Sequence, residues 1–141
     1  MKNFHELLLT RHSIRKYTDE PINADDVKTI LEAGLMAPTS KRSTAWNFIV
    51  VEDKEVLRQL SECRDAGATP IAGSALTIVV TVDMTRSEAW VEDGAIAATL
   101  MQLQAHDLGL GSCWIQLRNR FVGSEATEDY VRELLSIPEE M

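Results

Sequence analysis

Three polar side chains at alternate positions near the N-terminus could bind an anion together. Arg11, Ser13 and Arg15 alternate with His12 and Ile14, in a chain with 14 lysines and arginines against 22 aspartates and glutamates. If the backbone is extended here, these side chains point to one side, roughly 6–7 Å from one to the next. Guanidinium groups form forked hydrogen bonds to phosphate oxygens and other flat acceptors. The pattern therefore indicates either an anion site or arginines that pair with the abundant surface carboxylates.

A second polar stretch, between Pro38 and Ala45, carries the cations Lys41 and Arg42. We expect an exposed loop here, which is either a solvated turn or a clamp on a ligand. No metal site is expected, because the three histidines of the chain show no paired ligand spacing. The sequence also shows no serine–histidine–aspartate arrangement for nucleophilic catalysis.

Length and composition indicate an ordinary globular protein. The 141 residues predict a single domain, 1–141, and 45% hydrophobic and 26% charged residues are typical of a soluble one. The net charge of −8 argues against binding to nucleic acid or to anionic membranes, and no apolar run is long enough to span a bilayer. The N-terminus does not read as a signal peptide. Cys63 and Cys113 form no CxxC motif, so we expect reduced thiols and a cytoplasmic location.

Apolar periodicity predicts the elements that position these residues. We expect helices near 3–11, 23–37, 54–63, 88–108 and 128–135, and strands at 46–51, 75–82 and 112–117. Asn3, Asn23 and Thr127 are the expected N-caps of the first, second and last helices. Strand 75–82 is apolar throughout, which predicts cover on both faces of the sheet. Three strands are few for such a sheet, so either another copy of the chain supplies a strand or one follows Met141.

The longest predicted helix, 88–108, has a middle made of small and apolar residues on nearly every side. A helix of that composition is expected to be buried. Small side chains also permit close approach of another helix, so this helix is a candidate for a subunit interface as well as for the core.

Four stretches, taken in order, resemble the nitroreductase family of flavin enzymes. They are residues 11–17, residues 37–40 with Trp46 and the strand after it, residues 92–98, and residues 108–115. The resemblance extends over nearly the whole chain. It implies an α+β fold: a three-layer sandwich with a central mixed sheet flanked by helices, and the long central helix at a dimer interface.

The same resemblance implies a function. Members of the family are homodimers that bind FMN at the subunit interface and oxidise NAD(P)H. They reduce small planar acceptors such as nitroaromatics, quinones and enones by a ping-pong mechanism. The alternative is a flavin-binding or sensing protein of the same fold with little or no turnover.

Carried over to this chain, the resemblance assigns roles to the alternating residues. Arg11 and Ser13 would hold the FMN phosphate and ribityl end, and His12 would contribute partly through its backbone. Arg15 would reach the flavin edge near N1 and O2, where its charge stabilises the reduced flavin. The remaining cofactor contacts would come from a loop of the partner subunit and from the segment that lines the other ring face, namely Pro38, Thr39, Ser40, Cys113, Trp114 and Ile115.

This chain departs from the family pattern in two places. Arg42 and Thr44 stand where Asn and Gln are usual, and Ala45 replaces a proline, so Arg42 is expected to add charge at the phosphate site. Family members also typically continue past Pro138 into a further strand and a tail with a basic residue. The chain is therefore either a short member or a piece without that tail.

Overall fold

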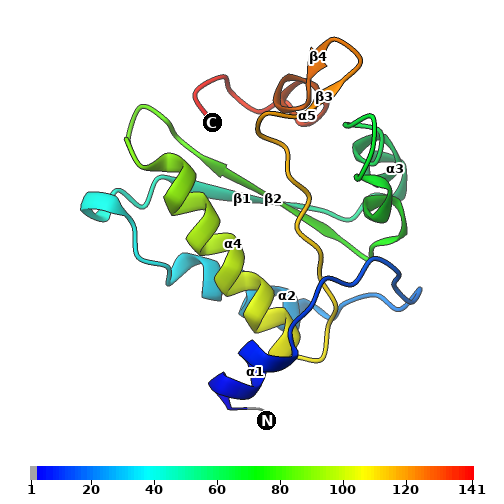
Figure 1. Ribbon diagram of the computed structural model, residues 1–141, viewed down its shortest axis with the longest axis vertical. Coiled ribbons are helices and arrows are strands. Elements are labelled where there is room, and N and C mark those ends of the chain that lie inside the picture. Colours follow the sequence, from blue (N-terminus) through cyan, green and yellow to red (C-terminus); the bar gives the residue numbers. More distant parts are fainter. Residues whose placement is uncertain (1–2) are drawn as a thin grey trace.

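The computed structural model describes residues 3–141, in which helices and short strands alternate (Figure 1). The helices are α1 (Phe4–Thr10), α2 (Ala24–Leu35), α3 (Lys54–Leu60), α4 (Trp90–Asp107) and α5 (Thr127–Leu135). The strands are β1 (Trp46–Val51), β2 (Thr77–Val82), β3 (Phe121–Val122) and β4 (Glu125–Ala126), with 3-10 turns η1 (Ser40–Arg42) and η2 (Thr69–Gly73). No helix within residues 3–141 is long and apolar enough to cross a membrane.

The N-terminal ends of α1 and α2 are fixed by the side chains that the sequence predicts. Asn3 accepts a hydrogen bond from the backbone N–H of Glu6 at 2.9 Å, and Glu6 accepts one from the N–H of Asn3 at 3.2 Å, which completes a capping box. Asn23 accepts from the N–H of Asp26 at 2.8 Å. Both caps are confirmed, and α2 ends before Pro38 as expected.

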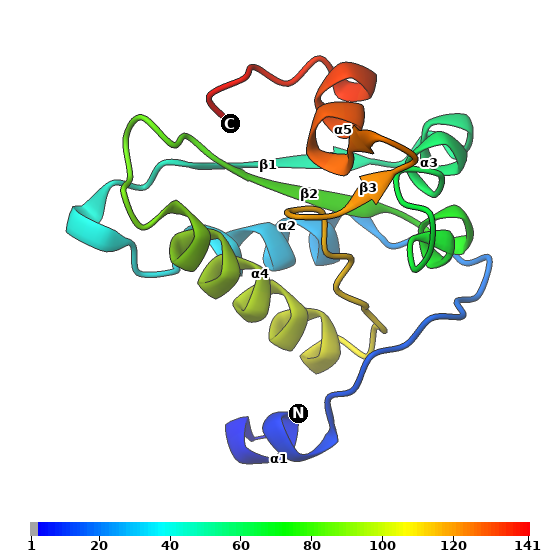
Figure 2. The ribbon, with the colours of Figure 1, turned by 45° about the horizontal axis from the view of Figure 1, so that its top comes forward.

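Strands β1 and β2 form an antiparallel pair in which Trp46 lies opposite Val82 and Val51 opposite Thr77. Helices α2 and α4 lie on one side of this pair and α5 on the other, as Figure 2 shows. Val79 belongs to the core under α3 and α5, whereas Val80 packs against the core formed with α2 and α4. The α+β class and the cover on both faces of β2 are thus confirmed.

Helix α4 lies very close to its neighbours on one face only. A Cβ atom added at Gly34 of α2 would lie 2.9 Å from the Met101 sulfur, and one at Gly94 would lie 3.3 Å from the Val82 side chain. On the outward face, Ile96 is 40% exposed. The expectation that this helix is buried all round is therefore wrong for a single copy of the chain, because Ile96 on its outward face stays exposed.

Three further expectations need correction. Residues 112–117 form no strand, since a strand requires a neighbour for its ladder hydrogen bonds and this segment runs apart from β2. The sheets within residues 3–141 are accordingly antiparallel pairs, β1–β2 and the hairpin β3–β4, and show no mixed pairing. Thr127 is the first residue of α5 instead of its cap. Its buried hydroxyl donates to the Cys63 carbonyl at 2.6 Å and fastens α5 to the end of α3.

Candidate functional site

The segment from Arg11 to Arg15 is held in place by backbone hydrogen bonds. Helix α1 ends at Thr10, and Arg11 leaves it in an extended conformation while its N–H still donates to the Leu7 carbonyl at 3.0 Å. Three residues on, the Ile14 N–H donates to the Ser112 carbonyl at 2.9 Å. Residues 11–15 are thereby fixed beside residues 111–115, which are about one hundred positions away in the sequence.

Part of this N-terminal segment lines a cavity, and the three predicted polar side chains do not. Ile14, Lys16, Tyr17 and Thr18 are in the lining, whereas Arg11, Ser13 and Arg15 are absent from it. Ile14 also packs on Gly111, where an added Cβ would come within 3.0 Å of it. The three polar side chains therefore lie outside this cavity, and we refer to them as the comb.

The comb residues are not engaged elsewhere in the described part of the chain. Across residues 3–141, no ion pair or side-chain hydrogen bond includes Arg11, Ser13 or Arg15. The alternative that the two arginines pair with surface carboxylates is thus not what the structure contains. His12 is exposed, and its Nδ1 lies 3.1 Å from the Thr10 carbonyl oxygen. The donors of the comb are available for a ligand that carries oxygen acceptors.

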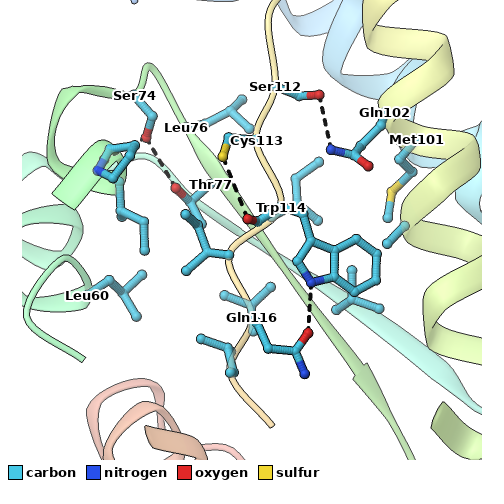
Figure 3. Close-up of a pocket in the computed structure, with 18 of the residues that line it drawn as sticks. Leu60, Ser74, Leu76, Thr77, Met101, Gln102, Ser112, Cys113, Trp114 and Gln116 are labelled. Carbon is cyan, nitrogen blue, oxygen red and sulfur yellow. Dashed lines mark hydrogen bonds between the residues drawn. The ribbon is translucent and has the colours of Figure 1, made fainter. Parts of the chain in front are cut away.

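The cavity beside the comb segment has a volume of about 760 Å³ and separates β2 from residues 109–118. Figure 3 shows residues Ser112–Gln116 on one wall, Ser74–Thr77 on another, and Met101 and Gln102 of α4 at the side. Cys113, Trp114 and Ile115 line it, and the Trp114 indole donates to Gln116 at 2.9 Å. These three predicted contact residues thus adjoin the comb segment and share their cavity with Ile14, Lys16 and Tyr17.

One phenol and two thiols lie in or near this cavity. Burial, helped by the nearby Cys113 thiol, raises the pKa of the Tyr17 phenol. Both Cys63 and Cys113 are free thiols. Residues 3–141 contain no group of three or more His, Cys, Asp and Glu side chains arranged to hold a metal ion.

The predicted loop, residues 38–44, is strained and compact. Lys41, Arg42 and Thr44 have φ values of 52°, 53° and 43°, the left-handed region that non-glycine residues seldom adopt. The hydroxyl of Thr39 accepts from the Thr44 N–H at 3.1 Å and closes the loop. Lys41 forms an exposed ion pair with Glu88 at 2.9 Å. Arg42 is exposed, and its side chain forms no ion pair or hydrogen bond among the described residues.

Asp93, in the first turn of α4, connects this loop to the core, and this role was not predicted from the sequence. Asp93 is only 2% exposed. Its carboxylate accepts hydrogen bonds from the Ser40 N–H at 2.9 Å and from the Ser43 hydroxyl at 3.3 Å. The Ser87 hydroxyl adds a third bond at 2.7 Å. Burial acts to raise the pKa of Asp93, but these three hydrogen bonds outweigh it and hold the pKa below its usual value.

The two groups of candidate residues occupy opposite ends of α4. The comb half-site, residues 11–15 with residues 111–115, is joined to the last turns by Thr10 and His106, whose side chains meet at 2.7 Å. The loop half-site, residues 38–44 with Asp93, is joined to the first turn. At 1.5 Å per residue, Asp93 and His106 are about 20 Å apart along the helix. In Figure 1, α1 lies by one end of α4, and the loop that contains η1 lies by the other end.

Comparison with known proteins gives consistent matches. The model of the nitroreductase family matches residues 8–83 and 67–141. A protein of Archaeoglobus fulgidus, provisionally named NADH dehydrogenase/NAD(P)H nitroreductase, is 34% identical over 142 residues, which is 99% of this chain and 79% of that protein. The structure of an FMN-dependent nitroreductase from Clostridium difficile R20291 is 46% identical, with a TM-score of 0.93 over 95% of this chain and 79% of the other. A protein from Desulfovibrio desulfuricans, provisionally described as a nitroreductase and solved in complex with FMN, is 26% identical, with a TM-score of 0.78 over 96% and 76% of the two chains.

Proposed function

Since the chain belongs to the nitroreductase family, we propose that it is an FMN-dependent oxidoreductase that takes hydride from NAD(P)H. The reduced acceptor is a small planar molecule such as a nitroaromatic, a quinone or an enone, and the two half-reactions follow one another in a ping-pong mechanism. The observation that carries the proposal is the comb: two guanidinium groups and a hydroxyl at alternate positions of an anchored segment, which form no ion pair or side-chain hydrogen bond among residues 3–141.

The chemistry of the comb suits FMN. Arg11 and Ser13 would hold the phosphate and the ribityl end, with His12 beside them, because charge-assisted hydrogen bonds to phosphate are strong and directional. The Ile14 N–H bond to Ser112 fixes the backbone, so the donors are preorganised and little ordering is needed on binding. In a chain with a net charge of −8, two unpaired arginines four positions apart in the sequence form a local site of attraction for an anion.

FMN supplies the redox chemistry when it is bound, and the protein binds it, orients it and tunes it. The Arg15 guanidinium would lie at the pyrimidine edge of the ring, where negative charge gathers on reduction, and its fixed positive charge would favour that charge. Residues 113–115 would border the ring from the segment that the Ile14–Ser112 bond holds against the comb segment. No acid, base or nucleophile of the chain is needed for this reaction.

We further propose that a complete site needs two copies of the chain. The loop half-site and the comb half-site of one copy are about 20 Å apart along α4, whereas hydrogen bonds act over about 3 Å. Pro38, Thr39, Ser40 and Arg42 would therefore approach the flavin that is bound by the comb of the partner. A homodimer is also supported by exposed apolar side chains: Leu9 of α1 is 71% exposed and Ile96 of α4 is 40% exposed.

The visible spectrum of the purified protein tests the proposal. We expect a yellow protein, or one that turns yellow on addition of FMN, with one flavin per chain. Anaerobic NADH or NADPH should bleach its visible bands, and a quinone or a nitrofuran should restore them. A colourless dimer that ignores added FMN would contradict the proposal. Retention of FMN without bleaching by either nucleotide would instead support the flavin-binding alternative without turnover.

The expected place of action is the cytoplasm. Cys63 is buried and Cys113 lies in the cavity wall, and both are free thiols, a state that a reducing compartment maintains. Fractionation of the source cells, followed by immunodetection, would test this location.

A further inference from the structure

Asp93 is a buried carboxylate that is stabilised by hydrogen bonds and not by a cation. Its donors come from three separate positions, the Ser40 N–H and the hydroxyls of Ser43 and Ser87. None of the ion pairs found in residues 3–141 includes it. A buried charge is costly unless it is fully hydrogen-bonded, and the N-terminal end of α4 adds a favourable dipole. The carboxylate and the loop therefore depend on each other.

The loop that Asp93 holds would not keep its shape through local preference alone. Lys41, Arg42 and Thr44 are all in the left-handed region, and none of them is a glycine. Such residues persist only where the surrounding structure fixes them, and they are frequent at functional sites. The other links from outside the loop are the Lys41–Glu88 pair, which is exposed and contributes little, and the bond from the Arg86 guanidinium to the Ser43 carbonyl at 3.0 Å.

We propose that Asp93 is the positioning residue of the loop half-site, which holds residues 40–43 in their strained conformation so that the loop is preformed for the cofactor bound by the partner's comb. The proposal rests on the proposed function for the identity of the ligand. The claim that Asp93 fixes the loop does not depend on it. Asp93 touches no reacting atom in this scheme and acts only through the residues it positions.

A preformed loop matters for affinity because the apparent affinity of a site is reduced in proportion to the fraction of molecules that are in the binding-competent conformation. With Asp93 present, two bonds tie the backbone N–H of Ser40 and the side chain of Ser43 to a rigid helix. Without it, the left-handed residues can relax to their ordinary conformations. The loop would then visit its binding conformation only in a minority of molecules.

The first experiment measures the loop without any ligand. Lys41 and Arg42 are trypsin sites in the exposed part of the loop, so cleavage after them in native, flavin-free protein reports how often the loop opens. We expect cleavage at these two bonds to be at least about tenfold faster in Asp93→Ala than in wild type. Glu92→Gln is the matched control, because Glu92 is the exposed neighbour in the same turn, and its rate should stay within about twofold of wild type.

The second experiment measures FMN affinity through flavin fluorescence, at a temperature where circular dichroism shows each variant folded. We expect Asp93→Ala to weaken binding about tenfold or more and Glu92→Gln to leave it unchanged. Asp93→Asn should lie between them, since its carbonyl can accept from Ser40 and its NH₂ can donate to the serine hydroxyls. At saturating FMN, the flavin bound to Asp93→Ala should be more accessible to iodide quenching, which a loss of stability alone would not produce.

The outcomes separate the two proposals. Unchanged cleavage at Lys41 and Arg42 in Asp93→Ala overturns the positioning role, whatever the protein binds. Faster cleavage with unchanged FMN affinity also overturns it, because the loop would then have no part in binding. If Asp93→Ala is cleaved faster but the wild-type protein binds no FMN, the role of Asp93 in holding the loop is supported and the proposed function is overturned. Should Asp93→Ala fail to fold, Ser43→Ala decides in its place, with about threefold faster cleavage expected and an unchanged rate overturning the role.

Discussion

The two half-sites of this protein are built in opposite ways. The comb half-site has relaxed, extended backbone, and its side chains are left uncommitted while a single bond from Ile14 to Ser112 fixes its position. The loop half-site has strained backbone at Lys41 and Arg42, and its polar groups are committed to the buried Asp93. The comb thus presents charged side chains from an unstrained backbone. The loop instead has a strained backbone conformation, which the buried Asp93 carboxylate must maintain.

This difference teaches where each half-site is vulnerable. Loss of a comb side chain removes a ligand contact and should leave the fold intact, because no ion pair or side-chain hydrogen bond within residues 3–141 includes those side chains. Loss of Asp93 leaves buried donors without an acceptor and should affect both folding and binding. Variants in the comb are therefore expected to separate binding from stability, and variants at the loop anchor are expected to couple them.

The largest expected effect is on FMN affinity when the comb loses a charge. Arg15→Ala or Arg11→Ala should weaken binding about 10- to 100-fold, since a hydrogen bond to a charged group contributes about 1.5–3 kcal/mol. Lys16→Ala is the matched control: it removes an adjacent cation whose side chain lines the cavity on the opposite side, and binding should change less than about twofold. Fluorescence titration measures all three. Equal losses in Lys16→Ala and Arg15→Ala would point to general charge attraction and against a comb.

A mixed dimer should show that the half-sites combine between copies. In a purified heterodimer of an Arg15→Ala chain and an Asp93→Ala chain, assembly between subunits places both changes in one site and leaves the other intact. We expect one tightly bound FMN per heterodimer, against none in either homodimer. If each site were built within one chain, the heterodimer would have two weakened sites and no tight one. Equilibrium dialysis with two affinity tags on the chains measures this stoichiometry.

The junction that anchors the comb should be sensitive to added volume. Gly111→Ala would bring a Cβ within 3.0 Å of the Ile14 side chain, so that side chain must move, at about 1–3 kcal/mol of unfolding free energy. Gly73→Ala is the control, because an added Cβ there meets nothing within 4 Å. Chemical denaturation gives both values. No difference between the two variants would mean that the contact between Ile14 and Gly111 is easily relieved.

The smallest expected effect is the loss of the Asp93 contribution in acid. Its pKa is lower in the folded protein than the usual value of about 3.9, so the contribution is complete above that pH and is lost as the pH falls through the folded value. The difference in unfolding free energy between wild type and Asp93→Ala, about 1–3 kcal/mol, should be constant from pH 5 to 7 and shrink as the pH falls below about 4. A difference that grows in acid would show that Asp93 is not stabilised as the carboxylate.

Much of the local structure was predictable because it depends on neighbours in the sequence. The caps at Asn3 and Asn23, strand β1 and the two-sided burial of β2 all follow from short-range patterns, and the structure confirms them. The alternation of Arg11, Ser13 and Arg15 is of the same kind. Even there, the sequence left open whether the arginines pair with surface acids, because it could not show which carboxylates would come near.

The errors arose where one segment needs another that is distant in the chain. Residues 112–117 carry an apolar pattern typical of a strand, but a strand also needs a partner, and this segment lies across a cavity from β2. Thr127 has the side chain of a cap, yet its hydroxyl is used by the Cys63 carbonyl, which no local pattern reveals. The apolar middle of α4 predicted burial on all sides, and the single chain covers only one face.

The sequence by itself determined which residues could attract and hold an anion and that they occupy alternate positions, which extended backbone would turn to one side. Only the tertiary structure decided that the polar loop is strained and that Asp93, some fifty residues later, maintains it. Only the tertiary structure placed the two half-sites at opposite ends of α4. The physical reason is that charge and periodicity are written in neighbouring residues, whereas the satisfaction of a buried carboxylate depends on which distant donors the fold brings to it.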